Sequence, residues 1–270
     1  MRNPFTPYSV LRELFGRQRE SALAGEHLDH VARDGQPAPN LLVFTGVRGV
    51  GKTSLLSHIA EDAASQGFVT VWVSGYRNKP ITAELASAID QALAAAQIKG
   101  SSWTKQTLSL EVSLPGLKGS ASRESEQRGN TLTSVAAVER LLSEAALACA
   151  ERGGNTGVGL AVFLDELHAS PVDDLGVLLN ALQNITTAGR APLAMIAAGI
   201  PSISGNLTRA ATFGERTRFV MVPLLDLRSA ADALVWLADV GGAALDPDAA
   251  RLLASEATGF PYLLQLYGDH

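Results

Sequence analysis

The 270-residue sequence predicts an α/β fold in three layers, with helices on both faces of a mainly parallel sheet. Three observations support this prediction. Strand-like apolar runs alternate along the chain with helical stretches whose apolar residues share one face. The run 41–45 (Leu-Leu-Val-Phe-Thr) is continuously apolar up to its last residue, as expected for a central parallel strand buried on both faces. Apolar residues make up 46% of the chain, which is enough to build a sizeable core.

The elements of the first half follow from the spacing of apolar residues. They are a helix over 20–31, the strand over 41–45, a helix from Lys52 to Gly67, a strand over 69–74 and a helix from Pro80 to about Gly100. The helices carry apolar residues three and four positions apart, and each ends close to a glycine.

Residues 101–130 interrupt the alternation, and we predict an insertion there. Polar and apolar residues alternate over 108–114, which predicts a half-buried strand, and a polar stretch follows at 120–130. Several basic residues and Trp103 would suit a hairpin that faces nucleic acid. A solvated loop is the favoured alternative.

The second half returns to the alternation of helices and strands. Its predicted elements are a long helix over 131–152, a strand over 159–164, a helix over 172–188, a strand over 192–198, a short strand over 217–222 and an all-helical segment from Leu227. Cys149, the only cysteine, lies among alanines in the first of these helices and is interpreted as a packed thiol.

The turn after the first strand fits the phosphate-binding pattern G-x-x-x-x-G-K-[ST]. Glycines let successive backbone N–H groups curl around phosphates, and the helix that starts there points its positive end at the same anion. We expect Lys52 to reach the β- and γ-phosphates of ATP and the Thr53 hydroxyl to ligate Mg²⁺. The expected nucleotide contacts are Gly46, Val47, Arg48, Gly49, Val50, Gly51, Lys52, Thr53 and Ser54.

An acidic pair, Asp165 and Glu166, follows the apolar strand over 159–164. Parallel strands deliver their carboxyl ends to one edge of the sheet, so this pair should lie beside the phosphate-binding turn. Asp165 is expected to hold Mg²⁺, and Glu166 to orient and polarise the attacking water. The alternative is a solvated acidic turn. His168 is either a polar link near the γ-phosphate or a surface residue.

Taken in order, these motifs resemble an AAA+ ATPase of the origin-recognition-like branch, which includes stand-alone bacterial ATP-binding proteins and is related to STAND ATPases. The segments that carry the resemblance are 15–20, the phosphate-binding turn, 163–166, 198–201, 215–216 and 258–262. The resemblance implies the fold of a three-layer P-loop NTPase with sheet order 5-1-4-3-2. It also implies adenine contacts from Gly16, Arg17 and Pro261.

The resemblance implies two domains. The nucleotide-binding domain would span 1–226, with the insertion at 101–130, and a small helical lid would span 227–270. The lid is expected to be truncated, because the chain ends soon after Tyr267. Members of this group commonly carry a DNA-binding domain after the lid.

The resemblance also places an arginine just before the last strand, where it commonly points at the γ-phosphate of a neighbouring subunit. Arg216 is the first choice for this role and Arg218 the second. An ordinary salt bridge at the edge of the strand is the alternative.

Two features of the sequence depart from this group. The strand over 192–198 ends without the polar residue that usually touches the γ-phosphate, and Ser202 is the nearest substitute. No Arg or Lys follows Arg251, so the usual lid arginine is absent as well. Both departures predict slow hydrolysis, whereas ATP binding depends on the phosphate-binding turn.

The predicted function is ATP hydrolysis that drives or times assembly of a homo-oligomer on a partner, such as DNA or a nucleoprotein. One alternative is a slow STAND-like switch for signalling or defence, and another is an ATPase regulator of a mobile DNA element. No guanine-reading Asn-Lys-x-Asp string is present, which favours ATP. The net charge of −5 argues against a surface dominated by DNA contacts. The single cysteine and the absence of a long apolar run predict a cytoplasmic protein without a membrane partner.

Overall fold

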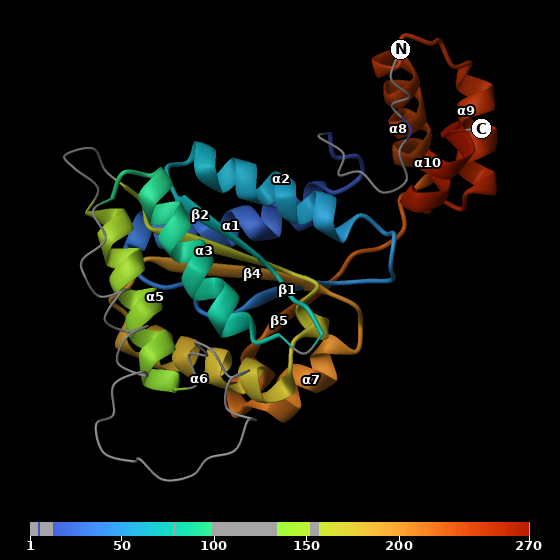
Figure 1. The fold of residues 1–270 in the computed structure, drawn as a ribbon. Coiled ribbons are helices and arrows are strands. Elements are labelled where there is room, and N and C mark those ends of the chain that lie inside the picture. The colour runs from blue at the N-terminus through green and yellow to red at the C-terminus, as the bar shows by residue number, and fades with distance from the viewer. Residues whose placement is uncertain (1–4, 6–12, 78, 99–133, 152–156, 270) are drawn as a thin grey trace, which may run out of the picture.

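A five-stranded parallel sheet forms the centre of the computed structural model, which describes Phe5 and residues 13–77, 79–98, 134–151 and 157–269 (Figure 1). The predicted insertion at 101–130, with its strand over 108–114, lies outside these residues. The strands are β1 (Leu42–Thr45), β2 (Val69–Ser74), β3 (Leu160–Asp165), β4 (Leu193–Gly199) and β5 (Arg218–Met221).

The strand order is β2-β3-β4-β1-β5, and every neighbouring pair is parallel. Read from the other edge, this is the predicted order 5-1-4-3-2. β1, β3 and β4 are buried at every position, which explains why their sequences are continuously apolar. The carboxyl ends of β1 and β3 therefore reach the same edge of the sheet, as the prediction of the site requires.

Helices cover both faces of the sheet and confirm the three layers (Figure 1). One face is packed by α1 (Gln18–Asp34) and α2 (Lys52–Ser65). The other is packed by α3 (Ile81–Ala95), α5 (Val135–Ala150), α6 (Val172–Ala188) and α7 (Ile203–Ala210). Cys149 is buried within this second layer, as predicted. The helix α7 was not predicted from the sequence.

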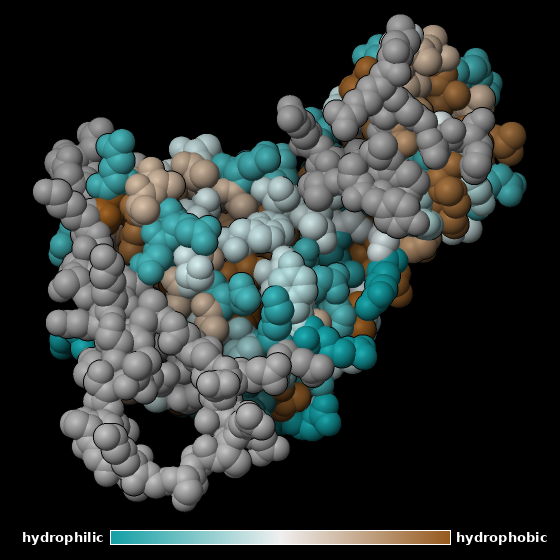
Figure 2. Space-filling view, viewed as in Figure 1, coloured by the Kyte–Doolittle hydropathy of each residue, from teal (hydrophilic) through white to brown (hydrophobic). Residues whose placement is uncertain are grey.

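Three further helices, α8 (Leu227–Val240), α9 (Pro247–Glu256) and α10 (Pro261–Asp269), form a separate group to one side of the sheet (Figure 1). We call them the C-terminal helices. They share a core of small residues and leucines that includes Ala230, Leu234 and Leu264. Val240 and Leu252 of these helices are exposed. Figure 2 shows apolar side chains on the surface of this group. Every helix among the described residues is too short or too polar to cross a membrane.

Candidate nucleotide-binding site

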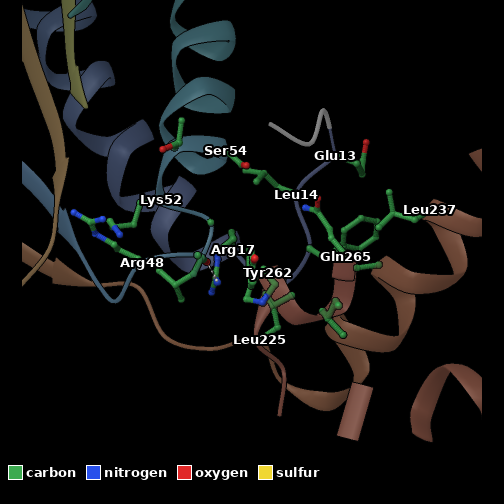
Figure 3. Close-up of a pocket in the computed structure, with 18 of the residues that line it drawn as sticks. Glu13, Leu14, Arg17, Arg48, Lys52, Ser54, Leu225, Leu237, Tyr262 and Gln265 are labelled. Atoms are coloured by element: carbon green, nitrogen blue, oxygen red, sulfur yellow. Dashed lines mark hydrogen bonds between the residues drawn. The ribbon is translucent and has the colours of Figure 1, made fainter. Parts of the chain in front are cut away.

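A cavity of about 430 Å³ lies where the phosphate-binding turn (46–53, hereafter the P-loop) meets the C-terminal helices (Figure 3). The P-loop, the first turn of α2 and Glu166 line one end. The other end is lined by residues of α8 and α10, by Leu225, and by Glu13, Leu14, Phe15 and Arg17. The volume falls in the range of small-ligand sites, and the site draws on segments far apart in the sequence.

The backbone of the P-loop adopts the conformation that its glycines were expected to allow. Gly49 and Gly51 have φ angles of 80° and 93°, in the left-handed region that favours glycine. Lys52 begins α2 and is buried, and its Nζ donates to the carbonyls of Gly46 at 3.0 Å and Val47 at 2.9 Å. Burial lowers the pKa of Lys52, and the nearby carboxylates of Glu166 and Asp165 oppose that shift. The ammonium group therefore lies inside the curl of the loop, next to the backbone that would surround a phosphate.

Thr53 and Asp165 lie together, as predicted for a magnesium site. The Thr53 hydroxyl donates to Asp165 Oδ2 at 2.9 Å, although the two residues are 112 positions apart in the chain. Asp165 is buried, and this burial raises the pKa of its carboxyl group, opposed by hydrogen bonds from Thr53 and the Glu166 backbone. A hydroxyl and a carboxylate fit Mg²⁺, which takes few protein ligands and completes its shell with phosphate and water. The residues present therefore suit this ion.

Glu166 is placed by an unusual backbone conformation at the end of β3. Its φ angle is 50°, so the chain turns sharply after Asp165, and the Glu166 side chain remains 41% exposed and lines the cavity. This partly exposed carboxylate therefore lines the cavity directly after Asp165, where it can contact water.

His168 connects this carboxylate to the end of β4. Its Nε2 lies 3.3 Å from Glu166 Oε2, and its Nδ1 accepts from the backbone N–H of Ile200 at 3.5 Å. The His168 side chain is only 9% exposed, and burial lowers its pKa. The alternative that His168 is a surface residue is therefore wrong. Its ring links Glu166 to the end of β4, which carries no polar side chain of its own.

The residues expected near adenine are only partly at the cavity. Arg17 is buried, lines the cavity and donates through Nη2 to the Val50 carbonyl at 2.9 Å. Pro261 also lines the cavity. Gly16 does not, because it packs against α8, where a Cβ would lie 2.8 Å from the Ser229 side chain.

Sequence reasoning missed most of the apolar end. Tyr262 donates its backbone N–H to the Gly49 carbonyl at 3.2 Å, which docks α10 directly onto the P-loop. Once α10 is recognised as a helix beginning at Pro261, helical spacing places Leu264 and Gln265 on the same side, and both line the cavity. Leu225 and the cavity-facing residues of α8 gave no comparable signal.

The remaining predicted residues do not line the cavity. Within the P-loop, Gly46 and Val47 do not line the cavity, and only their carbonyls take part, through Lys52. Arg218 pairs with Leu42, at the opposite end of β1 from the P-loop. Neither Arg216 nor Arg218 forms an ion pair with any described residue, so the salt bridge considered as the alternative is not seen there. Ser202 is exposed at the start of α7 and does not line the cavity.

Comparison with solved structures finds the same fold in several known proteins. Cdc6p from Pyrobaculum aerophilum is 15% identical, with a TM-score of 0.58 over 98% of this chain and 63% of that one. The ORC2 protein of Aeropyrum pernix, in ADPNP-ADP complexes, is 18% identical, with a TM-score of 0.60 over 98% of this chain and 63% of that one. The ORC1 protein of Aeropyrum pernix in complex with DNA is 18% identical, with a TM-score of 0.55 over 98% of this chain and 62% of that one.

This chain thus spans less than two thirds of the length of each of these structures. A search of curated protein sequences gives no significant match. A profile of the AAA ATPase domain matches residues 13–196, which is more than half of the chain and includes the P-loop, Thr53 and the Asp165-Glu166 pair. With the fold and the arrangement of these residues, the match shows that the chain belongs to the AAA ATPase domain family.

Proposed function

We propose that the chain binds ATP with Mg²⁺, hydrolyses it to ADP and phosphate, and uses this cycle to drive or time assembly on a partner. The observation that carries the proposal is the 2.9 Å contact between Thr53 and Asp165 beside the buried Lys52. A metal-binding hydroxyl, a metal-binding carboxylate and a phosphate-binding cation are the parts that phosphoryl transfer from ATP requires.

Each residue would act through its position. Lys52 would bind the β- and γ-phosphates, and the P-loop N–H groups would surround them. Thr53 and Asp165 would hold Mg²⁺, which when bound neutralises phosphate charge. Glu166, at the mouth of the cavity, would accept a proton from the attacking water, and His168 would hold the Glu166 carboxylate in place.

We assign the partner to nucleic acid or a nucleoprotein. Support for this choice comes from the ORC1 structure, which was solved in complex with DNA. Because the net charge is −5, the chain as a whole would repel a phosphate backbone. We therefore expect nucleic acid to be contacted through a local surface or a surface that forms on assembly.

A slow nucleotide switch is the second candidate, and one contact favours it. The hydrogen bond from Tyr262 to Gly49 joins α10 to the P-loop, so the same loop would contact both the phosphates and the C-terminal helices. A change of nucleotide could then bias the position of these helices without any motor activity.

Two substitutions test the proposed chemistry. Lys52→Ala should weaken ATP binding at least about tenfold, because charge-assisted hydrogen bonds to phosphate are lost. Glu166→Gln should leave ATP binding unchanged and lower turnover at least about a hundredfold, because the amide cannot accept the proton. Binding is measured by titration calorimetry and turnover by phosphate release. Glu61→Gln, an exposed change on α2, serves as the control. Unchanged turnover in Glu166→Gln would remove that residue from its role.

Measurement of turnover and molecular size separates the two candidates. Turnover is measured with and without duplex DNA, and the size of the protein is measured by chromatography in ATP and in ADP. A DNA-dependent ATPase should turn over faster with DNA and form larger species in ATP. Slow turnover that ignores DNA, with a size that depends on the nucleotide, would favour the switch.

A further inference from the structure

One buried polar group in the cavity has no role in the proposed chemistry. Gln265, on α10, lines the cavity and is only 7% exposed. Its Oε1 is buried and has no hydrogen-bond partner within the part of the chain that the structure describes. A buried acceptor that stays unpaired costs stability, so such a group usually has a partner.

The position of Gln265 is fixed by the way α10 meets the P-loop. The backbone N–H of Tyr262 donates to Gly49 at 3.2 Å, so the first turn of α10 is held against the loop. Gln265 lies four residues after Pro261, on the same side of the helix, and both residues line the cavity. The carboxamide therefore lies one turn beyond the contact with the P-loop.

The two ends of the cavity suit the two ends of a nucleotide. Lys52 and Arg48 lie together at one end, whereas Leu237 and Gln265 lie at the other (Figure 3). A planar base needs apolar surroundings and a triphosphate needs cations, so the base belongs at the end with Gln265. The carboxylate of Glu13 is another acceptor there, but it is exposed and remains accessible to water.

We propose that Gln265 determines the base specificity of this site, with Oε1 accepting a hydrogen bond from the exocyclic 6-amino group of adenine. This inference rests on the proposed binding of ATP and assigns the base. Guanine carries a carbonyl at the same ring position, and that carbonyl would face Oε1 as a second acceptor. A purine without any 6-substituent would leave Oε1 unpaired.

The test compares ATP with purine riboside triphosphate, which has the same sugar and phosphates but lacks the 6-amino group. Binding of each to the full chain is measured with Mg²⁺ by titration calorimetry. The wild-type protein should bind ATP about tenfold more tightly than purine riboside triphosphate, and GTP more weakly than ATP. Equal affinities for ATP and purine riboside triphosphate in the wild-type protein would overturn the inference without need of any variant.

Variants then assign the preference to the side chain. Gln265→Leu and Gln265→Met should each lower the affinity for ATP to that for purine riboside triphosphate, whose own affinity should not change. Thermal unfolding checks that each variant folds, and Gln91→Leu, on the exposed side of α3, is the matched control. A preference for ATP that survives in both variants would overturn the inference. Failure of the wild-type protein to bind any of these nucleotides would instead overturn the proposed function.

Discussion

At the scale of single residues, His168 brings a polar side chain to the end of a strand that has none of its own. The end of β4 consists of Ala197, Ala198 and Gly199, which offer no polar side chain. His168 reaches this point from the turn after β3, accepts from the Ile200 N–H and contacts Glu166. The position of the Glu166 carboxylate is therefore linked to the neighbouring strand through one imidazole ring.

We expect His168→Ala to lower turnover about tenfold and to leave ATP affinity unchanged. The reason is that the Glu166 carboxylate loses its contact, while Lys52 and Thr53 are untouched. Steady-state phosphate release and nucleotide titration measure the two effects separately. His30→Ala, which removes a partly exposed pair with Asp34 on α1, should change neither quantity. A parallel loss of ATP affinity in His168→Ala would show that the ring supports the fold of the site and does not position Glu166.

At the scale of helices and strands, α3 begins with a cap supplied by another helix. Asp174, in the first turn of α6, accepts from the backbone N–H groups of Ile81 and Thr82 and, at 2.6 Å, from the Thr82 hydroxyl. These N–H groups have no partner within their own helix. One carboxylate therefore joins the starts of two helices on the same face of the sheet.

Asp174→Ala should lower the free energy of unfolding by about 2 kcal/mol, because the first turn of α3 loses its cap. Urea unfolding measures this loss. The neighbouring substitution Asp173→Ala is the matched control, because Asp173 is exposed in the same turn of α6. Equal stability of the two variants would contradict the role of the cap.

The elements that could be predicted from the sequence are those with strong apolar patterns. β2 and α6 match their predicted limits, because each has a complete pattern bounded by turn residues. The helix α7 was missed because it has eight residues and only Ile203 and Leu207 are buried, which is too little to set a period.

The same limit applies to the site. Its phosphate end was predicted because Lys52, Thr53 and Asp165 stand in motifs whose chemistry requires those residue types. Apart from Arg17 and Pro261, the apolar end was not predicted, because Leu225, Leu237 and Gln265 meet there only after the C-terminal helices fold. A residue such as Gln265 has no local pattern that marks it, so only tertiary structure brings out its role.

At the scale of the whole molecule, Arg216 and Arg218 are too far from the P-loop to serve their own cavity. Both are exposed, they lie at the opposite end of the sheet, and neither forms an ion pair with a described residue. A role in catalysis therefore requires a second copy of the chain, with Arg216 of one copy facing the cavity of the next.

A mixing experiment checks this arrangement. Arg216→Ala should lower turnover at least about tenfold, and Arg209→Ala, an exposed change on α7, should not. Mixing Arg216→Ala with the inactive Glu166→Gln variant should restore part of the turnover, because each copy supplies what the other lacks. Absence of any recovery, with oligomers shown to form, would exclude Arg216 from acting between subunits.

The contact between Gly49 and Tyr262 has a consequence for the molecule as a whole. Gly49 has a left-handed φ angle, and a Cβ there would lie only 2.9 Å from that of Tyr262. The P-loop and the start of α10 can thus pack this closely because Gly49 has no side chain. The methyl group of Gly49→Ala would clash with Tyr262, so it would push the P-loop and the C-terminal helices apart without disturbing the core of either.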